Sequence, residues 1–436
     1  MTVSPQRRAD VVDALRNGAV PSRGLEYLAV SLDRFEAALG EELDRVRTGG
    51  AVFKAVRGEY GGGKTFFARW LGERAKRLGF AVSEIQINEA ETPLHRLETV
   101  YRRLVERLST SALETGALRA IIDGWFYTLD EDVLAGEGNR GMDDVRLAEA
   151  TSVLMEQRLA SIHQLSPMFP AALRAYRRAA AANDGPAAEA LLAWIAGQPN
   201  ITGKAIRDAG LRGAIDHFGA LGFLRGLLFI LRDSGHPGLL FILDEVETIQ
   251  RVRGDVREKS LNALRQLIDE LHADRFPGLY LLITGTPAFF EGPQGIRRLP
   301  PLASRLHVDF TTDDRWDNPR APQIRLAAFT VESLVEVGRR VRDLYAAHST
   351  APERIAQHCS DEYLVVLARA VTGGLGGKAG VAPRLFLKKL IGEVLDRIDQ
   401  FPDFDPRQHY SLTLSTAEMT DIEQAAFTPD DIDLSL

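Results

Sequence analysis

The sequence is poor in cysteine, with Cys359 the single one among 436 residues. One cysteine excludes an intrachain disulfide, so we expect a buried thiol in a reducing cytoplasm. No stretch approaches the roughly eighteen apolar residues that a membrane-spanning helix requires, and residues 1–8 contain no apolar core of a signal peptide. The nine histidines show no metal-ligand spacing. The sequence therefore points away from disulfide-rich secreted proteins, membrane proteins and zinc proteins.

Basic residues are outnumbered, since 53 Lys and Arg against 60 Asp and Glu give a formal net charge of −7. An acidic chain does not bind nucleic acid indiscriminately, so any DNA contact has to come from a local basic cluster. Residues 174–178 contain three arginines and form such a cluster, although a solvated helix face is its commoner role. The apolar content of 45% is enough for two or three domains.

Residues 58–65 match the pattern G-x-x-x-x-G-K-[ST], between an apolar run at 51–56 and an amphipathic helix at 66–78. In such a loop, glycines let backbone N–H groups point at a polyphosphate, the lysine reaches the β and γ oxygens, and the hydroxyl can bind Mg²⁺. The alternative is a turn between a strand and a helix. The predicted nucleotide-binding residues are Gly58, Tyr60, Gly61, Gly62, Gly63, Lys64, Thr65 and Phe66.

A second predicted part of the site is the apolar run 239–243, which ends in Asp244 and Glu245. A carboxylate at the end of a buried strand can hold Mg²⁺ together with Thr65, and the next acid can orient the attacking water. We therefore assign Asp244 to the metal and Glu245 to catalysis, and leave the orientation of Glu247 open. A buried strand capped by surface acids is the alternative.

Two further groups are candidates for sensing the γ-phosphate. Thr284 and Thr286 follow the apolar run 279–283, and either hydroxyl could contact the phosphate, although a threonine-rich turn is an equal alternative. Arg305 precedes a short predicted strand at 307–310 and is our candidate for an arginine that reaches the ATP of a neighbouring subunit in a homo-oligomer. Its rivals are Arg297 and Arg298, and an ordinary loop arginine is the alternative.

The remaining segments are mainly helical in pattern. Residues 7–17 and 32–47 are amphipathic, and the interval 89–237 is too long for a single crossover connection between two strands. A helix that begins near Pro383 brings Arg384 to where it could fold over the nucleotide. The predicted division is an N-terminal helical segment (1–50), an ATPase core (51–310) with a helical insertion (about 100–235), a helical lid (311–408) and an acidic tail (409–436). We expect that tail to be solvated, with protein docking as the alternative.

The order of these parts resembles the AAA+ ATPases, and within them the BrxD family of ATP-binding proteins in BREX-type bacteriophage defence systems. The resemblance covers about two thirds of the chain and rests on residues 14–21 with Gly24 and Leu25, on 58–65, on 243–247 and on 382–387. It implies an α/β P-loop NTPase with a parallel sheet core, a large helical insertion and a C-terminal helical lid. It also implies ATP and Mg²⁺ as cofactors, and a partner that acts on DNA, such as a helicase.

The sequence therefore predicts a Mg²⁺-dependent ATPase. A different class stays open, in which ATP binding assembles a protein complex and the chain acts as a nucleotide-gated switch or scaffold. A metabolite kinase is a weaker third option, because the Asp-Glu pair suits hydrolysis.

Overall fold

The computed structural model describes residues 4–136, 142–201, 203–376, 380, 382–419 and 423–424. Part of the glycine-rich loop at 373–380 and the predicted acidic tail after Gln424 lie outside the described residues.

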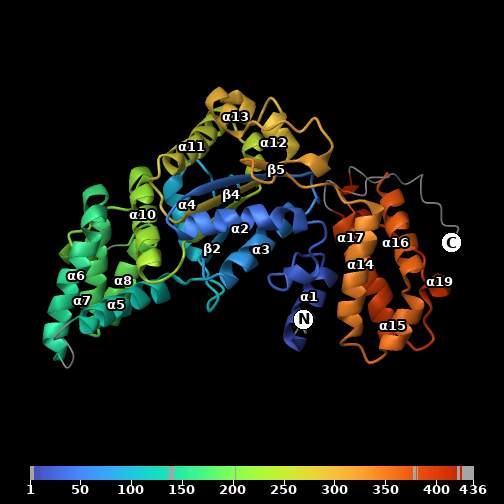
Figure 1. Cartoon of the computed structure of the whole chain (residues 1–436), viewed down its shortest axis with the longest axis horizontal. Coiled ribbons are helices and arrows are strands. Elements are labelled where there is room, and N and C mark those ends of the chain that lie inside the picture. Colours follow the sequence, from blue (N-terminus) through green and yellow to red (C-terminus); the bar gives the residue numbers. More distant parts are fainter. Residues whose placement is uncertain are drawn as a thin grey trace.

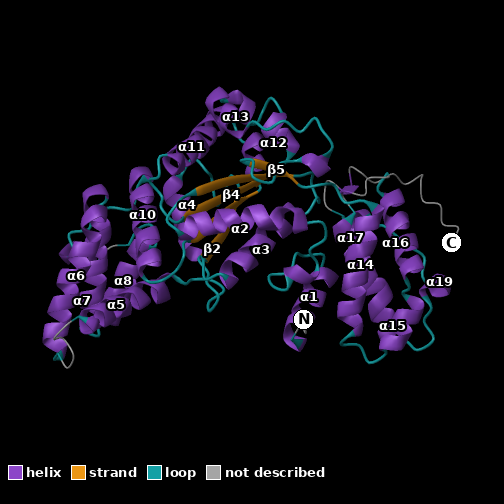
Figure 2. Ribbon diagram, viewed as in Figure 1, coloured by secondary structure: helices purple, strands orange, loops and turns teal. Residues whose placement is uncertain are grey.

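A five-stranded parallel sheet forms the centre of the molecule (Figure 2). Its strands lie in the order β2-β3-β4-β1-β5, and every neighbouring pair is parallel. The strands are β1 (Val52–Arg57), β2 (Ala81–Gln86), β3 (Leu239–Asp244), β4 (Leu279–Gly285) and β5 (Gln323–Arg325). All residues of β1, β3 and β4 are buried, as expected for parallel strands covered on both faces. The carboxyl ends of these strands therefore meet at one edge of the sheet.

The prediction of a strand at 307–310 is wrong, because these residues are irregular and the edge strand is β5. The free side of β1 pairs with residues 323–325, and the backbone N–H of Ala55 donates to Pro322 O at 2.8 Å. Phe310 instead places its ring beside the guanidinium of Arg57. The free edge of β1 is therefore covered by a segment more than ten residues beyond the predicted strand.

Helices cover both faces of the sheet (Figure 1). On one face α2 (Asp33–Arg47) and α3 (Lys64–Arg77) bury apolar side chains spaced at helical intervals, among them Phe35, Leu39 and Phe67. On the other face lie α4 (Leu97–Glu106) and α11 (Gly254–His272). Two short helices follow β4, α12 (Pro287–Glu291) and α13 (Pro300–Leu306).

The long helical interval lies at one end of the molecule (Figure 1). It consists of α5 (Leu118–Ala135), α6 (Asp144–Leu165), α7 (Met168–Ala181), α8 (Gly185–Ile195), α9 (Lys204–Asp208) and α10 (His217–Asp233). Its apolar core is continuous with that of the sheet. The helices α7 and α10 approach closely at Gly226, because a Cβ atom there would lie 2.4 Å from the ring of Phe169.

The C-terminal helices lie at the other end and have a core of their own (Figure 1). They are α14 (Val331–Ala346), α15 (Pro352–His358), α16 (Asp361–Gly374), α17 (Pro383–Lys389), a π-helical segment (Leu390–Leu395), α18 (Asp396–Gln400) and α19 (Pro406–His409). The first helix of the chain, α1 (Pro5–Arg16), packs into this core, and Arg16 forms a two-pronged ion pair with Asp396 at 2.7 and 2.9 Å. Within the described residues, no helix combines the length and apolar character needed to cross a bilayer.

Candidate nucleotide site

The loop between β1 and α3 (residues 58–63), the candidate phosphate loop, has the backbone that the glycine pattern predicts. Gly61 (φ +73°) and Gly63 (φ +85°) adopt the left-handed conformation that favours glycine. Gly63 is the N-cap of α3 and provides no side-chain cap, and the first turn of α3 contains no acidic residue. The backbone N–H groups at this helix end therefore remain available to an anion, which the helix dipole also favours.

Lys64 lies folded over this loop. Its Nζ donates to the carbonyl oxygens of Gly58 (3.1 Å) and Glu59 (3.2 Å), and it is 3.6 Å from a carboxylate oxygen of Glu247. The half-buried ring of Tyr60 lies 5.0 Å from the same atom. The ammonium group of Lys64 thus lies within the loop, where it already interacts with two carbonyl oxygens and one carboxylate oxygen.

A chain of hydrogen bonds links the ends of three neighbouring segments. Thr65 Oγ1 donates to Asp244 Oδ2 at 2.8 Å, and Thr284 Oγ1 donates to the other oxygen, Oδ1. Thr284 Oγ1 also accepts the backbone N–H of Glu245 at 3.1 Å. Asp244 and Thr284 are buried, so these bonds have little competition from water. The parallel order of β3, β4 and β1 brings the three residues together.

The oxygens of Thr65 and Asp244 suit Mg²⁺, which prefers hard oxygen ligands. In the described part of the chain, no three His, Cys, Asp or Glu side chains form a group that could hold a metal. Nucleotide sites hold Mg²⁺ with one or two protein oxygens together with substrate phosphates, and Thr65 and Asp244 offer two such oxygens.

Glu245 has a strained backbone and a partner that the sequence did not reveal. Its φ of +58° is unusual for a residue other than glycine, and such strain persists where the surrounding structure imposes it. Gln86, the last residue of β2, donates a hydrogen bond from Nε2 to Glu245 Oε2 at 2.5 Å. The sequence does show a polar residue, Gln86, at the end of a strand. It identifies Gln86 as a partner of Glu245 only once β2 is known to lie beside β3.

The two threonines at the carboxyl end of β4 differ: Thr284 is part of the strand and Thr286 follows it. Thr284 belongs to the hydrogen-bonded chain, whereas the buried hydroxyl of Thr286 has no hydrogen-bond partner within the described residues. Thr286 is the N-cap residue of α12 but forms no side-chain cap. Its hydroxyl is therefore the one still available to a ligand.

Glu247, whose orientation the sequence left open, is buried near Lys64. Burial raises the pKa of its carboxyl, and the charge of Lys64 opposes that shift. Burial also raises the pKa of the Tyr60 hydroxyl. The phosphate loop is thus bordered by weakly solvated polar groups.

Arg305 lies away from the phosphate loop of its own chain. Its Nε is 2.6 Å from Asp269 Oδ1, and its Nη1 donates to Pro301 O at 2.6 Å. Asp269 is in the last turn of α11, which leads from the carboxyl end of β3 back toward the amino end of β4. The rivals Arg297 and Arg298 are exposed. None of the three joins the group around Lys64 and Asp244.

Arg384 is also engaged elsewhere. Its Nε donates to Glu423 Oε1 at 2.9 Å, and its Nη2 donates to Glu418 O at 2.7 Å. Glu423 and Met419 are buried, so this part of the predicted solvated tail packs against the C-terminal helices instead. This part of the tail is buried because Met419 adds an apolar side chain to the C-terminal core and Arg384 pairs with the carboxylate of Glu423.

The N-terminal segment 14–25 is fastened to α3 by two residues that sequence reasoning missed. Glu73 accepts the backbone N–H groups of Gly24 and Leu25, both at 3.0 Å, and Arg69 donates to Val20 O at 2.9 Å. This segment therefore lies beside the helix that begins at the phosphate loop. Phe66, on the same helix, is half-buried and packs against both the apolar cluster between the sheet and α2 and α3 and the core of the C-terminal helices.

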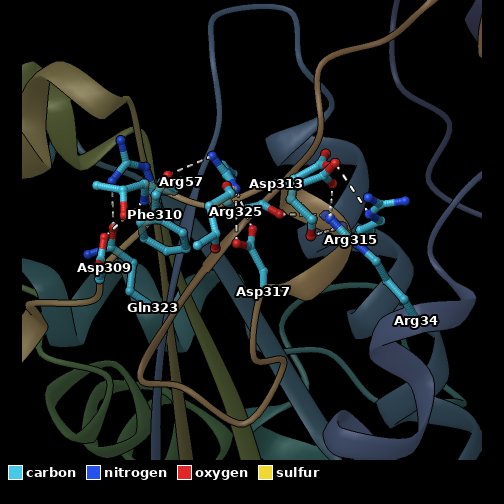
Figure 3. Close-up of polar contacts among 12 residues, drawn as sticks. Arg34, Arg57, Asp309, Phe310, Asp313, Arg315, Asp317, Gln323 and Arg325 are labelled. Atoms are coloured by element: carbon cyan, nitrogen blue, oxygen red, sulfur yellow. Dashed lines mark hydrogen bonds and ion pairs between the residues drawn. The ribbon is translucent and has the colours of Figure 1, made fainter.

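Figure 3 shows a cluster that braces the end of β1. The ring of Phe310 lies between the guanidinium carbons of Arg57, at 4.7 Å, and Arg325, at 5.2 Å. Arg325 forms two hydrogen bonds of 2.9 Å with the buried carboxylate of Asp317. Since Gly58 follows Arg57 directly, the cluster fixes the start of the phosphate loop.

The basic cluster of the helical insertion is partly neutralised within the chain. Arg174 Nη1 lies 2.7 Å from both carboxylate oxygens of Glu156, and Arg177 Nη2 is 2.9 Å from Asp130. Arg178 is exposed. DNA phosphates would have to compete with these carboxylates.

The parallel sheet, the glycine loop after β1 and the Asp-Glu pair after β3 define a mixed α/β protein consistent with a P-loop-like nucleotide-binding core. Over residues 3–414 the chain matches the family described as "BREX system ATP-binding protein BrxC/D", and it belongs to that family. The resemblance to BREX ATP-binding proteins is thereby confirmed, and it implies an ATP-binding protein of phage defence. Among curated proteins no match was found.

Proposed function

We propose that the chain is a Mg²⁺-dependent ATPase with an AAA+-like core, and that its turnover serves a DNA-processing partner in bacteriophage defence. The observation that carries this proposal is the hydrogen-bonded group of Thr65, Asp244 and Thr284, with Glu245 attached to it through its backbone N–H. A hydroxyl, a buried carboxylate and a second acid at the end of the same strand suit hydrolysis better than binding alone.

In this proposal each residue has a distinct role. The N-terminus of α3 and Lys64 bind the phosphates, and Thr65 with Asp244 would hold Mg²⁺, which neutralises charge on the phosphates when bound. Glu245 orients the attacking water. Gln86 Nε2 donates to Glu245 Oε2 at 2.5 Å, so Gln86 competes with the attacking water for this carboxylate oxygen.

The first test separates binding from hydrolysis. We expect Lys64→Ala to abolish ATP binding, because Lys64 contacts phosphate in the ground state, whereas Glu245→Gln should bind ATP normally and fail to hydrolyse it. Calorimetry gives the affinities and phosphate release gives the rates. Normal ATP affinity in the Lys64 variant would contradict the assignment.

The proposal includes a homo-oligomer in which Arg305 acts on the ATP of a neighbouring subunit. Arg305 is paired with Asp269 of α11, and its side chain is about a third exposed. An arginine supplied in trans is typically worth roughly 10³ to 10⁵ in turnover. Specific activity should therefore rise with protein concentration, and Arg305→Ala should lose turnover while keeping ATP affinity.

Mixing two inactive variants provides the control for an arginine supplied by the neighbouring subunit. Lys64→Ala and Arg305→Ala are each expected to be inactive alone, and their mixture should recover activity because one interface pairs an intact loop with an intact arginine. Concentration-independent turnover by a monomer would refute the trans arrangement.

A second candidate function is a nucleotide-gated switch in the cytoplasm, and two contacts favour it. Glu245 is bound to Gln86 and Arg384 is bound to Glu423, so two groups of the site are diverted from the nucleotide. ATPase rates with and without DNA distinguish the two functions. Stimulation by DNA supports the ATPase working with a helicase or another defence protein, whereas ATP-dependent partner binding without stimulation supports the switch.

A further inference from the structure

Glu247 is a buried carboxylate beside the phosphate loop. It lies in a short 3₁₀ segment (Val246–Arg251) directly after Glu245, and its side chain is 2% exposed. Within the described residues, no other residue donates a hydrogen bond to either of its carboxylate oxygens. A carboxylate removed from water in this way is costly unless a cation compensates it.

Lys64 is the cation next to Glu247. The distance from Lys64 Nζ to Glu247 Oε1 is 3.6 Å, which is an ion pair without a hydrogen bond, while the two carbonyl oxygens of the loop lie closer, at 3.1 and 3.2 Å. The ammonium therefore divides its interactions among three oxygens that a bound polyphosphate would replace. Glu245, in contrast, faces Gln86 and does not share this contact.

We infer that Glu247 is the counter-ion which the nucleotide must displace from Lys64, and that it thereby limits the affinity of the site for nucleotides. This inference rests on the proposed nucleotide site. When Lys64 turns to the phosphates, Glu247 loses its compensating charge and stands close to a second anion. Both effects oppose binding, and the repulsion grows with the charge of the ligand, so the affinity for ATP is lowered more than the affinity for ADP.

The test uses Glu247→Gln, which keeps the shape of the side chain and removes its charge. Binding of fluorescent N-methylanthraniloyl ATP and ADP to the full chain is titrated with Mg²⁺ present. We expect about tenfold tighter ATP binding and a smaller gain for ADP, because a close charge pair in a poorly solvated site is strong. The matched control is Glu59→Gln, which removes the same charge at an exposed position of the same loop and should change affinity less than about twofold.

A thermal unfolding cycle tests the pair without nucleotide. Lys64→Met should lower the melting temperature because it leaves Glu247 uncompensated, and adding Glu247→Gln to that variant should restore part of the loss. The inference is overturned if Glu247→Gln changes ATP affinity no more than Glu59→Gln does, or if the double variant is no more stable than Lys64→Met. Failure of the unsubstituted chain to bind ATP would defeat the proposed function instead, and the thermal cycle would still decide whether Glu247 and Lys64 are paired.

Discussion

Replacing Thr284 with valine tests how the acidic pair at the end of β3, Asp244 and Glu245, is held. Valine has nearly the same shape as threonine but removes the hydroxyl, so Asp244 Oδ1 loses its donor and the backbone N–H of Glu245 loses its acceptor. Asp244 is 4% exposed and Thr284 is fully buried, so water does not readily replace either bond. Thr284→Val therefore removes both hydrogen bonds that the buried hydroxyl of Thr284 forms.

The expected magnitude follows from these two bonds. A hydrogen bond to a charged group contributes about 1.5–3 kcal/mol, and a buried N–H left without an acceptor costs about 1–3 kcal/mol. Together they predict a loss of about 2.5–6 kcal/mol, which for a domain of 150–250 residues lowers the melting temperature by roughly 5–20 °C. Turnover should fall as well, because Asp244 and Glu245 are no longer held in position.

Thr286→Val is the matched control, since its buried hydroxyl has no hydrogen-bond partner in the described part of the chain. This variant should melt at or slightly above the temperature of the unsubstituted protein, because an unsatisfied polar group is removed. Thermal unfolding followed by circular dichroism measures both variants, and Thr284→Ser should retain most of the stability. Equal losses in the two valine variants would refute the reasoning.

Three further predictions concern other parts of the chain. Glu423→Gln should raise turnover about fivefold, because it weakens a half-buried ion pair worth ~1 kcal/mol and releases Arg384; unchanged phosphate release would contradict this. Lys54→Met should destabilise the protein by about 3–5 kcal/mol because it strands the carboxylate of Glu42, whereas the double variant with Glu42→Gln should recover much of that loss in urea unfolding. Burial raises the pKa of the Cys359 thiol to about 12, so at pH 8 it should react with a disulfide reagent only after unfolding, and immediate reaction of the native protein would show the thiol to be accessible.

The sequence predicted the elements that depend on local pattern. The glycine loop at 58–65, the apolar strands before Asp244 and Thr284, and the proline at the start of α17 are all present close to the predicted limits. Such features follow from backbone conformation and from hydrophobic runs, which neighbouring residues determine. The family could be recognised for the same reason, because its motifs are short and contiguous.

Other features were decided by contacts between distant segments. The fifth strand is Gln323–Arg325 instead of 307–310, because pairing with β1 depends on which segment reaches its free edge. Gln86 joins Glu245 only because β2 lies next to β3, and Glu423 meets Arg384 only because the end of the chain packs on the C-terminal helices. No local pattern carries this information.

Whether a polar side chain is buried or exposed was the least predictable property. Glu247 follows Glu245 by two residues, yet Glu247 is buried against Lys64 whereas Glu245 faces Gln86. The sequence by itself determined which residue types and which loop the nucleotide site contains. Only the tertiary structure decided which charges face each other, because Coulomb energy and desolvation depend on distance and burial, and both arise when separate elements pack together.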